Sequence, residues 1–126
     1  MAKHATRWSS RPTEEDFRAA LNYLSRQFPM AIAQRVVQKA RRTLPVQRIA
    51  KDILRASNLS LLPLDEVHVA RDLKRIHKGK RLAPIILVQG DLTRGRPLVI
   101  ADGFHRMCAA CHANEDASVA AVLVKS

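Results

Sequence analysis

The segment from Leu98 to Cys111 constrains the fold of this chain more than any other stretch. It begins with an apolar run, passes through Asp102-Gly103, and continues with a stretch that can form a helix. Asp-Gly favours a tight turn, and glycine adopts backbone conformations that other residues avoid. The order therefore predicts a buried strand, a sharp turn and a helix.

The first turn of this predicted helix carries His105 and Arg106. Unpaired backbone N–H groups and the positive end of the helix dipole favour an anion there, most often a phosphate. Arg106 offers a planar fork of donors, and His105 can donate to a phosphate or move a proton near neutral pH. Asp102 can orient either residue or hold Mg²⁺. Asp102 and His105 are thus candidate catalytic residues.

A structural interpretation of the same segment is also open. In that interpretation, Asp102-Gly103 is an ordinary turn and helix cap. His105 and Arg106 are then exposed side chains of the first helical turn, without a ligand.

The N-terminal part predicts a helical extension. Residues 1–11 are polar and basic and predict a flexible tail, and residues 12–57 predict three short amphipathic helices separated by Pro29 and Pro45. Thr13 is the expected cap of the first helix, and the three acids that follow it suit the helix dipole. The second helix, over 30–43, has a basic outer face (Arg35, Lys39, Arg42), and the third is expected over 46–57.

Residues 58–126 predict strands and helices in alternation. A helix is expected from Asp65 or Glu66 to about His77, strands over 84–88, 97–101 and 119–124, a glycine-containing hairpin loop over 90–96, and the helix over 104–113. The chain is therefore expected to be an α+β fold, with 12–57 and 58–126 packed as one compact unit.

The apolar strand Ala83–Val88, the Asp102–Arg106 turn and the final strand together resemble the ParB N-terminal/sulfiredoxin-like superfamily over about residues 60–126. The Asp-Gly-x-His-Arg form is nearest to a branch with ParB-like nuclease and free-serine kinase-like proteins. The resemblance implies a small mixed sheet with flanking helices, preceded here by the three-helix extension.

The resemblance also implies ligands for the turn. Sulfiredoxins carry Gly-Cys-His-Arg and bind ATP, whereas ParB proteins carry Gly-Glu-Arg-Arg and bind CTP with a metal. Phe104 stands at the sulfiredoxin cysteine and at the ParB glutamate, so sulfiredoxin activity is not expected. The implied cofactor is ATP or CTP with Mg²⁺, and the implied nucleotide or phosphate contacts are Gly103, Phe104, His105 and Arg106.

The charge of the chain suggests a second kind of partner. Its 22 Lys and Arg against 11 Asp and Glu give a formal net charge of +11, which suits a polyanion such as nucleic acid. The densest basic run follows one predicted helix and the residues after it (Arg71, Lys74, Arg75, Lys78, Lys80, Arg81). Three hypotheses follow: nucleotide or phosphate binding at the turn, nucleic-acid binding by basic helical faces, or phosphoryl transfer to a small metabolite.

Cys108-Ala-Ala-Cys111-His112 matches the string of covalent haem attachment. Haem is not expected, because the N-terminus carries no export signal and the string lies within a helix that must pack on a sheet. Zinc is not expected either, because one helix cannot supply a closed set of four ligands from His105, Cys108, Cys111 and His112. A second ligand pair is lacking, since His68 and His77 are the only nearby candidates. Both cysteines are expected to be packing residues, and the protein is expected to be cytoplasmic and free of membrane spans.

Overall fold

Nearly continuous apolar runs along three strands build a sheet that is buried on both faces. In the computed structural model, which describes residues 6–125, these strands are β4 (Ile85–Val88), β5 (Val99–Asp102) and β6 (Ser118–Val124). β4 pairs antiparallel with β5 and parallel with β6, and the strand order is β2-β6-β4-β5. The predicted α+β class with a small mixed sheet and flanking helices is confirmed.

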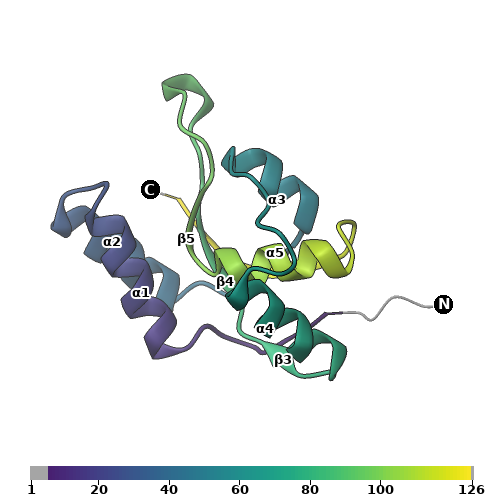
Figure 1. Ribbon diagram of the computed structural model, residues 1–126. Coiled ribbons are helices and arrows are strands. Elements are labelled where there is room, and N and C mark those ends of the chain that lie inside the picture. Colours follow the sequence, from purple (N-terminus) through teal and green to yellow (C-terminus); the bar gives the residue numbers. More distant parts are fainter. Residues whose placement is uncertain (1–5, 126) are drawn as a thin grey trace.

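Helices α1 (Glu14–Ser25) and α2 (Met30–Arg41) cover one face of this sheet (Figure 1). Their buried side chains pack on alternate sheet residues in one core cluster (Phe17, Leu24, Val36, Val37, Ile86, Val88, Val122, Val124). The predicted cap is present: Thr13 Oγ1 accepts from the Asp16 N–H at 3.1 Å, and Asp16 Oδ2 accepts from the Thr13 N–H at 2.9 Å.

Helices α3 (Ala50–Ser57) and α5 (Phe104–Ala113) lie on the opposite side, and α4 (Val67–His77) packs on α5. A second core cluster joins these helices to the other set of sheet residues (Ile53, Val69, Ile76, Ile85, Leu87, Ile100, Met107, Val119). The sheet thus separates two apolar cores, each with its own helices.

The expected third helix over 46–57 is wrong in its first turn. Residues Val46–Ile49 form β2, which pairs antiparallel with β6, and only Ala50–Ser57 is helical. A helix over 46–57 would place Val46 and Ile49 toward the core, but they are 37% and 40% exposed at the sheet edge. The extension therefore contributes an edge strand to the sheet rather than helices alone.

Part of the segment expected to be a flexible tail, residues 1–11, is paired as a strand. Residues 1–5 lie outside the described residues, but β1 (Arg7–Trp8) pairs parallel with β3 (Arg81–Leu82). The Ser9 N–H also donates to the Leu82 carbonyl at 2.8 Å. Trp8 packs against the core cluster around α4 and α5, which explains why this segment is ordered.

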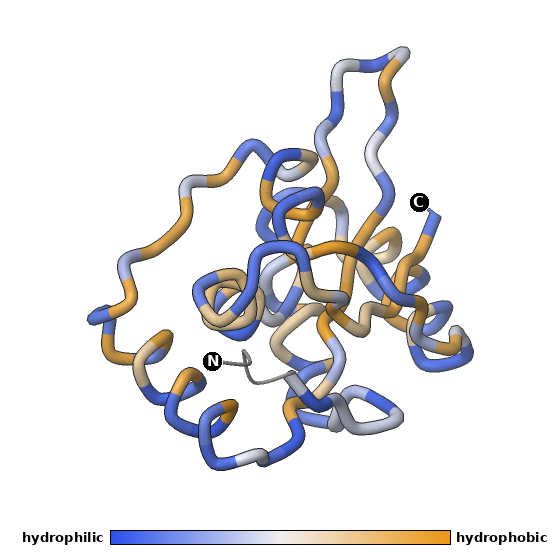
Figure 2. The backbone as a smooth tube through the Cα atoms, turned by 90° about the vertical axis from the view of Figure 1, so that its right-hand side faces the viewer, coloured by the Kyte–Doolittle hydropathy of each residue, from blue (hydrophilic) through white to orange (hydrophobic). Residues whose placement is uncertain are grey.

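The connection between β4 and β5 forms an arm that projects from the body (Figures 1 and 2). An isolated bridge joins Asp91 to Arg96, and the short 3-10 helix η1 (Leu92–Arg94) forms the tip. Leu92 at this tip is 97% exposed. Within residues 6–125, no helix combines the length and the apolar character that crossing a bilayer requires.

Candidate functional site

The guanidinium of Arg106 points inward from the first turn of α5. Its Nε donates to the Ala83 carbonyl at 3.0 Å, and its Nη2 donates to the Pro84 carbonyl at 3.3 Å and to Asp102 Oδ2 at 3.0 Å. Its Nη1 lies 3.5 Å from Asp16 Oδ1 in α1. The side chain is 17% exposed, so this guanidinium is already committed to internal acceptors.

This geometry contradicts an exposed Arg106 side chain, while the phosphate role of Arg106 stays a prediction. The residue was expected to meet a phosphate or, in the structural interpretation, to be an exposed first-turn side chain. Instead it ties α5 to the segment before β4 and to the start of α1. Two carboxylates beside it also oppose a phosphate at this point, because like charges repel.

Gly103 is required by packing at the start of α5. Its φ is +99°, and a Cβ built there would lie 2.4 Å from Ile85 Cγ2 and 3.0 Å from Arg106 Nη2. Any other residue would therefore be strained and would clash with β4. At Gly103 the backbone therefore approaches the neighbouring strand β4 closely.

Asp102 lies at the end of β5 in a mostly dry environment. Its pKa is raised to about 6: burial is the main cause, the Arg106 charge opposes it, and the nearby carboxylate of Asp16 adds to it. Two carboxylates share one guanidinium here, so a single cation cannot compensate for both. A carboxyl group that titrates near neutral pH is a chemically reasonable acid or base, as predicted for Asp102.

A pocket of about 360 Å³ opens beside this turn. Its lining combines residues of α1 and the connector after α3 with the strand-to-helix turn (Ala19, Tyr23, Leu59, Ile100, Ala101, Asp102, Gly103, Phe104, His105). α5 begins at Gly103 without a side-chain cap. The structure thus brings Asp102, Gly103, Phe104 and His105 together at one pocket, while Arg106 lies behind it.

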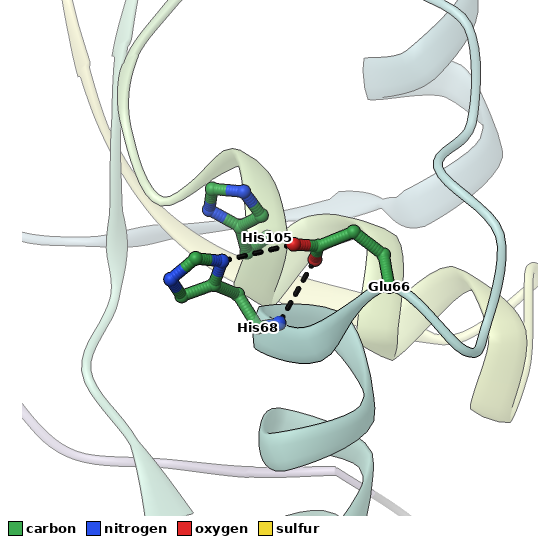
Figure 3. A group of neighbouring side chains, drawn as sticks. All are labelled: Glu66, His68 and His105. Carbon is green, nitrogen blue, oxygen red and sulfur yellow. Dashed lines mark hydrogen bonds and ion pairs between the residues drawn. The ribbon is translucent and has the colours of Figure 1, made fainter.

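His105 lies beside two side chains from the start of α4, of which His68 was a nearby candidate ligand in the sequence and Glu66 was not. Figure 3 shows its ring beside His68 and Glu66, at the start of α4; the two imidazole centroids are 4.7 Å apart. Glu66 Oε1 lies 2.9 Å from His68 Nδ1, and Glu66 Oε2 accepts from the His68 and Val69 N–H groups at 3.0 and 2.9 Å. These hydrogen bonds, led by the one from Val69, lower the pKa of Glu66 to about 2.

Only part of this cluster, the pair Glu66 and His68, could be found from the sequence. Glu66 and His68 are two residues apart at a predicted helix start, which was visible. Their proximity to His105 depends on how α4 packs on α5, and no local pattern specifies that packing.

The cysteines of the Cys108-Ala-Ala-Cys111-His112 motif are surrounded by core residues. Cys108 and Cys111 are free and buried in the core, which confirms their packing role, and burial raises the pKa of both thiols. His112 lies near Leu62, with Nε2 2.7 Å from the Leu62 carbonyl oxygen. Among the described residues, the donor atoms grouped with His105 are those of Glu66 and His68, not those of the cysteines or His112.

The predicted basic run along α4 is exposed but is not purely basic. The buried carboxylate of Asp72 lies among its cations, 3.7 Å from Arg71 Nε and 3.8 Å from Arg75 Nη1. Lys74, Lys78 and Lys80 are exposed on the same helix and the turn that follows. Arg81 lies in β3 rather than in the helix.

A second basic surface runs along α2. Two adjoining depressions of about 480 and 510 Å³ share Arg35 and Lys39. We call them together the α2 groove; its cations come from α2, the β4–β5 arm and the end of β6 (Arg35, Lys39, Arg42, Arg94, Arg96, Lys125). Among the described residues, no carboxylate lines the groove. The sequence predicted the α2 face but not the arginines of the arm.

Comparisons of this chain with protein-family models, with curated proteins and with solved structures find no match.

Proposed function

We propose that this protein binds the sugar-phosphate backbone of a nucleic acid in the α2 groove. The observation that supports this best is the joining of six cationic side chains from three elements in a lining without a carboxylate. The formal net charge of +11 supports the same class of partner.

The spacing of the cations favours an extended polyanion over a single phosphate group. Arg35, Lys39 and Arg42 follow one face of α2 at intervals of four and three residues. A helix rises about 1.5 Å per residue, so these positions span about 10 Å along the helix axis. Such a row is suited to successive phosphates, and it provides affinity without reading sequence.

The arm completes the other side of the groove. Arg96 lies with its guanidinium carbon 5.9 Å from the centroid of the Phe28 ring, so it is placed beside α2. Arg94 is exposed near the tip of the same arm, where its Nε is 3.6 Å from Asp91 Oδ2. We expect Arg96 to bind phosphate more strongly than Arg94, because Asp91 partly neutralises Arg94.

The proposal is tested by fluorescence anisotropy with labelled duplex DNA of random sequence, single-stranded DNA and RNA, over a series of salt concentrations. The test variant combines Arg35→Gln, Lys39→Gln and Arg96→Gln. All three residues are exposed, so the fold should persist. If each contacts a phosphate, the slope of log affinity against log salt falls by roughly 2.7, since each contact contributes about 0.9 on duplex DNA.

The matched control has the same change of net charge on α4 and the turn after it, through Lys74→Gln, Lys78→Gln and Lys80→Gln. We expect this control to keep the salt slope of the original chain. An equal loss in both variants would indicate attraction by net charge alone. A loss confined to the α4 variant would assign binding to the basic run first predicted from the sequence.

The pocket beside Asp102 supports a second candidate function, the binding of a small anion such as the phosphate of ATP or CTP with Mg²⁺. The uncapped start of α5 and His105 would supply the contacts, and Arg106 would position the helix. The proposed ParB/sulfiredoxin-like relationship of residues 60–126 points to the same ligands.

Thermal-shift measurements with ATP, CTP and ADP, with and without Mg²⁺, test this candidate. Stabilisation lost in His105→Ala supports it, and turnover only with an added hydroxyl substrate would indicate phosphoryl transfer.

A further inference from the structure

We propose that Glu66, His68 and His105 bind one divalent transition-metal ion, with Zn²⁺ as the ion that best suits these donors. A nitrogen or oxygen atom of each residue lies within 4.8 Å of the others. Two imidazoles and one carboxylate form a common ligand set for zinc sites that keep an open position. This inference is independent of nucleic-acid binding in the α2 groove.

The carboxylate of Glu66 is oriented before any ion arrives. Its Oε2 accepts from the backbone N–H groups of His68 and Val69 at the start of α4. These bonds fix the carboxylate plane and leave Oε1 directed at the imidazoles, as Figure 3 shows. Hydrogen bonds that hold a ligand in position commonly strengthen metal binding, because less freedom is lost when the ion binds.

The two histidines come from helices that are held together by the core. His68 and Val69 are neighbours in α4, and His105 lies two residues before Met107 in α5; Val69 and Met107 are fully buried in one cluster. The backbones that carry the imidazoles are therefore fixed relative to each other. Side-chain rotation is the only adjustment that the site requires.

That adjustment is small. Zinc lies about 2.0–2.2 Å from nitrogen and oxygen ligands, so tetrahedral ligand atoms are roughly 3.4 Å apart. The Glu66 and His68 atoms are 2.9 Å apart in their hydrogen bond, and the three donor atoms are within 4.8 Å. An ion would take the place of the proton between Glu66 and His68, and no donor atom would need to move closer to another by more than about 1.4 Å.

The position of the cluster gives the ion access to a ligand. His105 also lines the pocket beside Asp102. Three protein ligands leave at least one coordination position for water or a ligand atom. The site is therefore of the open type, at the edge of a pocket with Asp102 in its lining.

Isothermal titration of the untagged, metal-free full chain with Zn²⁺ tests the proposal. We expect one equivalent to bind, and His68→Ala and His105→Ala each to weaken binding by at least about tenfold. The matched control is His77→Ala, which removes a histidine from the same helix outside the cluster. We expect its affinity to stay within twofold of the original chain.

A second variant guards against loss of the fold. In Glu66→Gln the side-chain oxygen can still accept from the His68 and Val69 N–H groups, so the α4 start is kept while the charged ligand is removed. We expect binding at least about tenfold weaker, with an unchanged metal-free far-UV spectrum. The proposal is overturned if the original chain takes up no Zn²⁺, or if binding persists unchanged in His68→Ala and His105→Ala.

Discussion

At the scale of single residues, Arg106 shows how one side chain can join distant parts of a chain. It binds two backbone carbonyls before β4 and approaches carboxylates from α1 and β5. Arg106→Met would leave Asp16, Asp102 and the two carbonyls without their shared donor. Because breaking a buried ion pair leaves uncompensated charge, we expect a loss of about 3–5 kcal/mol in the free energy of unfolding, measured by urea denaturation.

The control for this prediction is Arg18→Met, an exposed arginine on α1. Surface charges of this kind typically change stability by less than about 0.5 kcal/mol. A loss for Arg106→Met that is no larger than the loss for Arg18→Met would show that the internal network adds no stability, and Arg106 would again be a candidate ligand.

The raised pKa of Asp102 predicts that the free energy of unfolding falls as the pH rises, which is unusual for a carboxylate beside an arginine. Burial raises its pKa from 3.8 to about 6, so between these values the folded protein holds the proton more tightly than the unfolded chain does. The stability that this proton contributes is complete below about pH 4 and is lost as the pH rises through 6. Asp102→Asn removes this dependence, since the amide does not titrate.

The measurement is the free energy of unfolding of both proteins by urea from pH 4 to pH 7. We expect the original chain to lose on the order of 2 kcal/mol relative to Asp102→Asn over this range. The difference between the two free energies of unfolding at each pH removes the contribution of groups that titrate in both proteins. Parallel curves would contradict the prediction, because they would mean that Arg106 holds Asp102 ionised throughout.

At the scale of elements, the sequence predicted helices that local residue patterns specify. It missed a strand whose formation depends on pairing with a distant segment. Phe104–Ala113 was predicted with the observed bounds, since glycine precedes a continuous helical pattern. Residues 46–49 also fit a helical pattern, because Val46, Ile49 and Ile53 recur at intervals of three and four. Their pairing with β6 made them a strand instead, and the partner lies about 70 residues further along the chain.

The candidate site follows the same rule. Asp102, Gly103 and His105 could be singled out because a strand, a turn and a helix place them together locally. The acceptors of Arg106 lie 22, 23 and 90 positions away, apart from Asp102 at four. A motif match cannot show whether an arginine faces solvent or the interior, so its predicted ligand role could not be checked from sequence.

Helix α4 contains a charged residue on its buried face. Asp72 lies between Val69 and Ile76, its side chain is 2% exposed, and neither carboxylate oxygen has a hydrogen-bond partner within the described residues. Such a carboxylate costs stability unless its cations compensate, and Arg71 and Arg75 approach only to 3.7 and 3.8 Å. We expect Asp72→Leu to stabilise the protein by about 1 kcal/mol or more in urea denaturation.

The control for this prediction is Asp72→Asn, which removes the charge but leaves a buried amide. We expect a smaller gain than for leucine, because the amide still lacks partners. Destabilisation of both variants by more than about 2 kcal/mol would instead indicate that attraction to the arginines offsets the desolvation penalty of the buried carboxylate.

At the scale of the whole molecule, the two cores share one sheet. Ile86 and Val88 of β4 pack on α1 and α2, whereas Ile85 and Leu87 pack on the side of α3 and α5. Residues 12–57 supply both helices of the first face, and β2 supplies the edge strand next to β6. The extension and the unit over 58–126 are therefore packed around one shared sheet.

This arrangement predicts that residues 58–126 do not fold alone. Removing 1–57 would expose one apolar face of the sheet, leave the edge of β6 unpaired and take Asp16 from Arg106. Exposed apolar sheet faces and free edges favour association. We expect the fragment to lack a cooperative thermal transition by circular dichroism and to aggregate in size-exclusion chromatography.

The control for this prediction is the chain over 6–126, which keeps β1 and every other described element. A cooperative transition of the 58–126 fragment as a monomer would contradict the prediction and make residues 12–57 a separable extension.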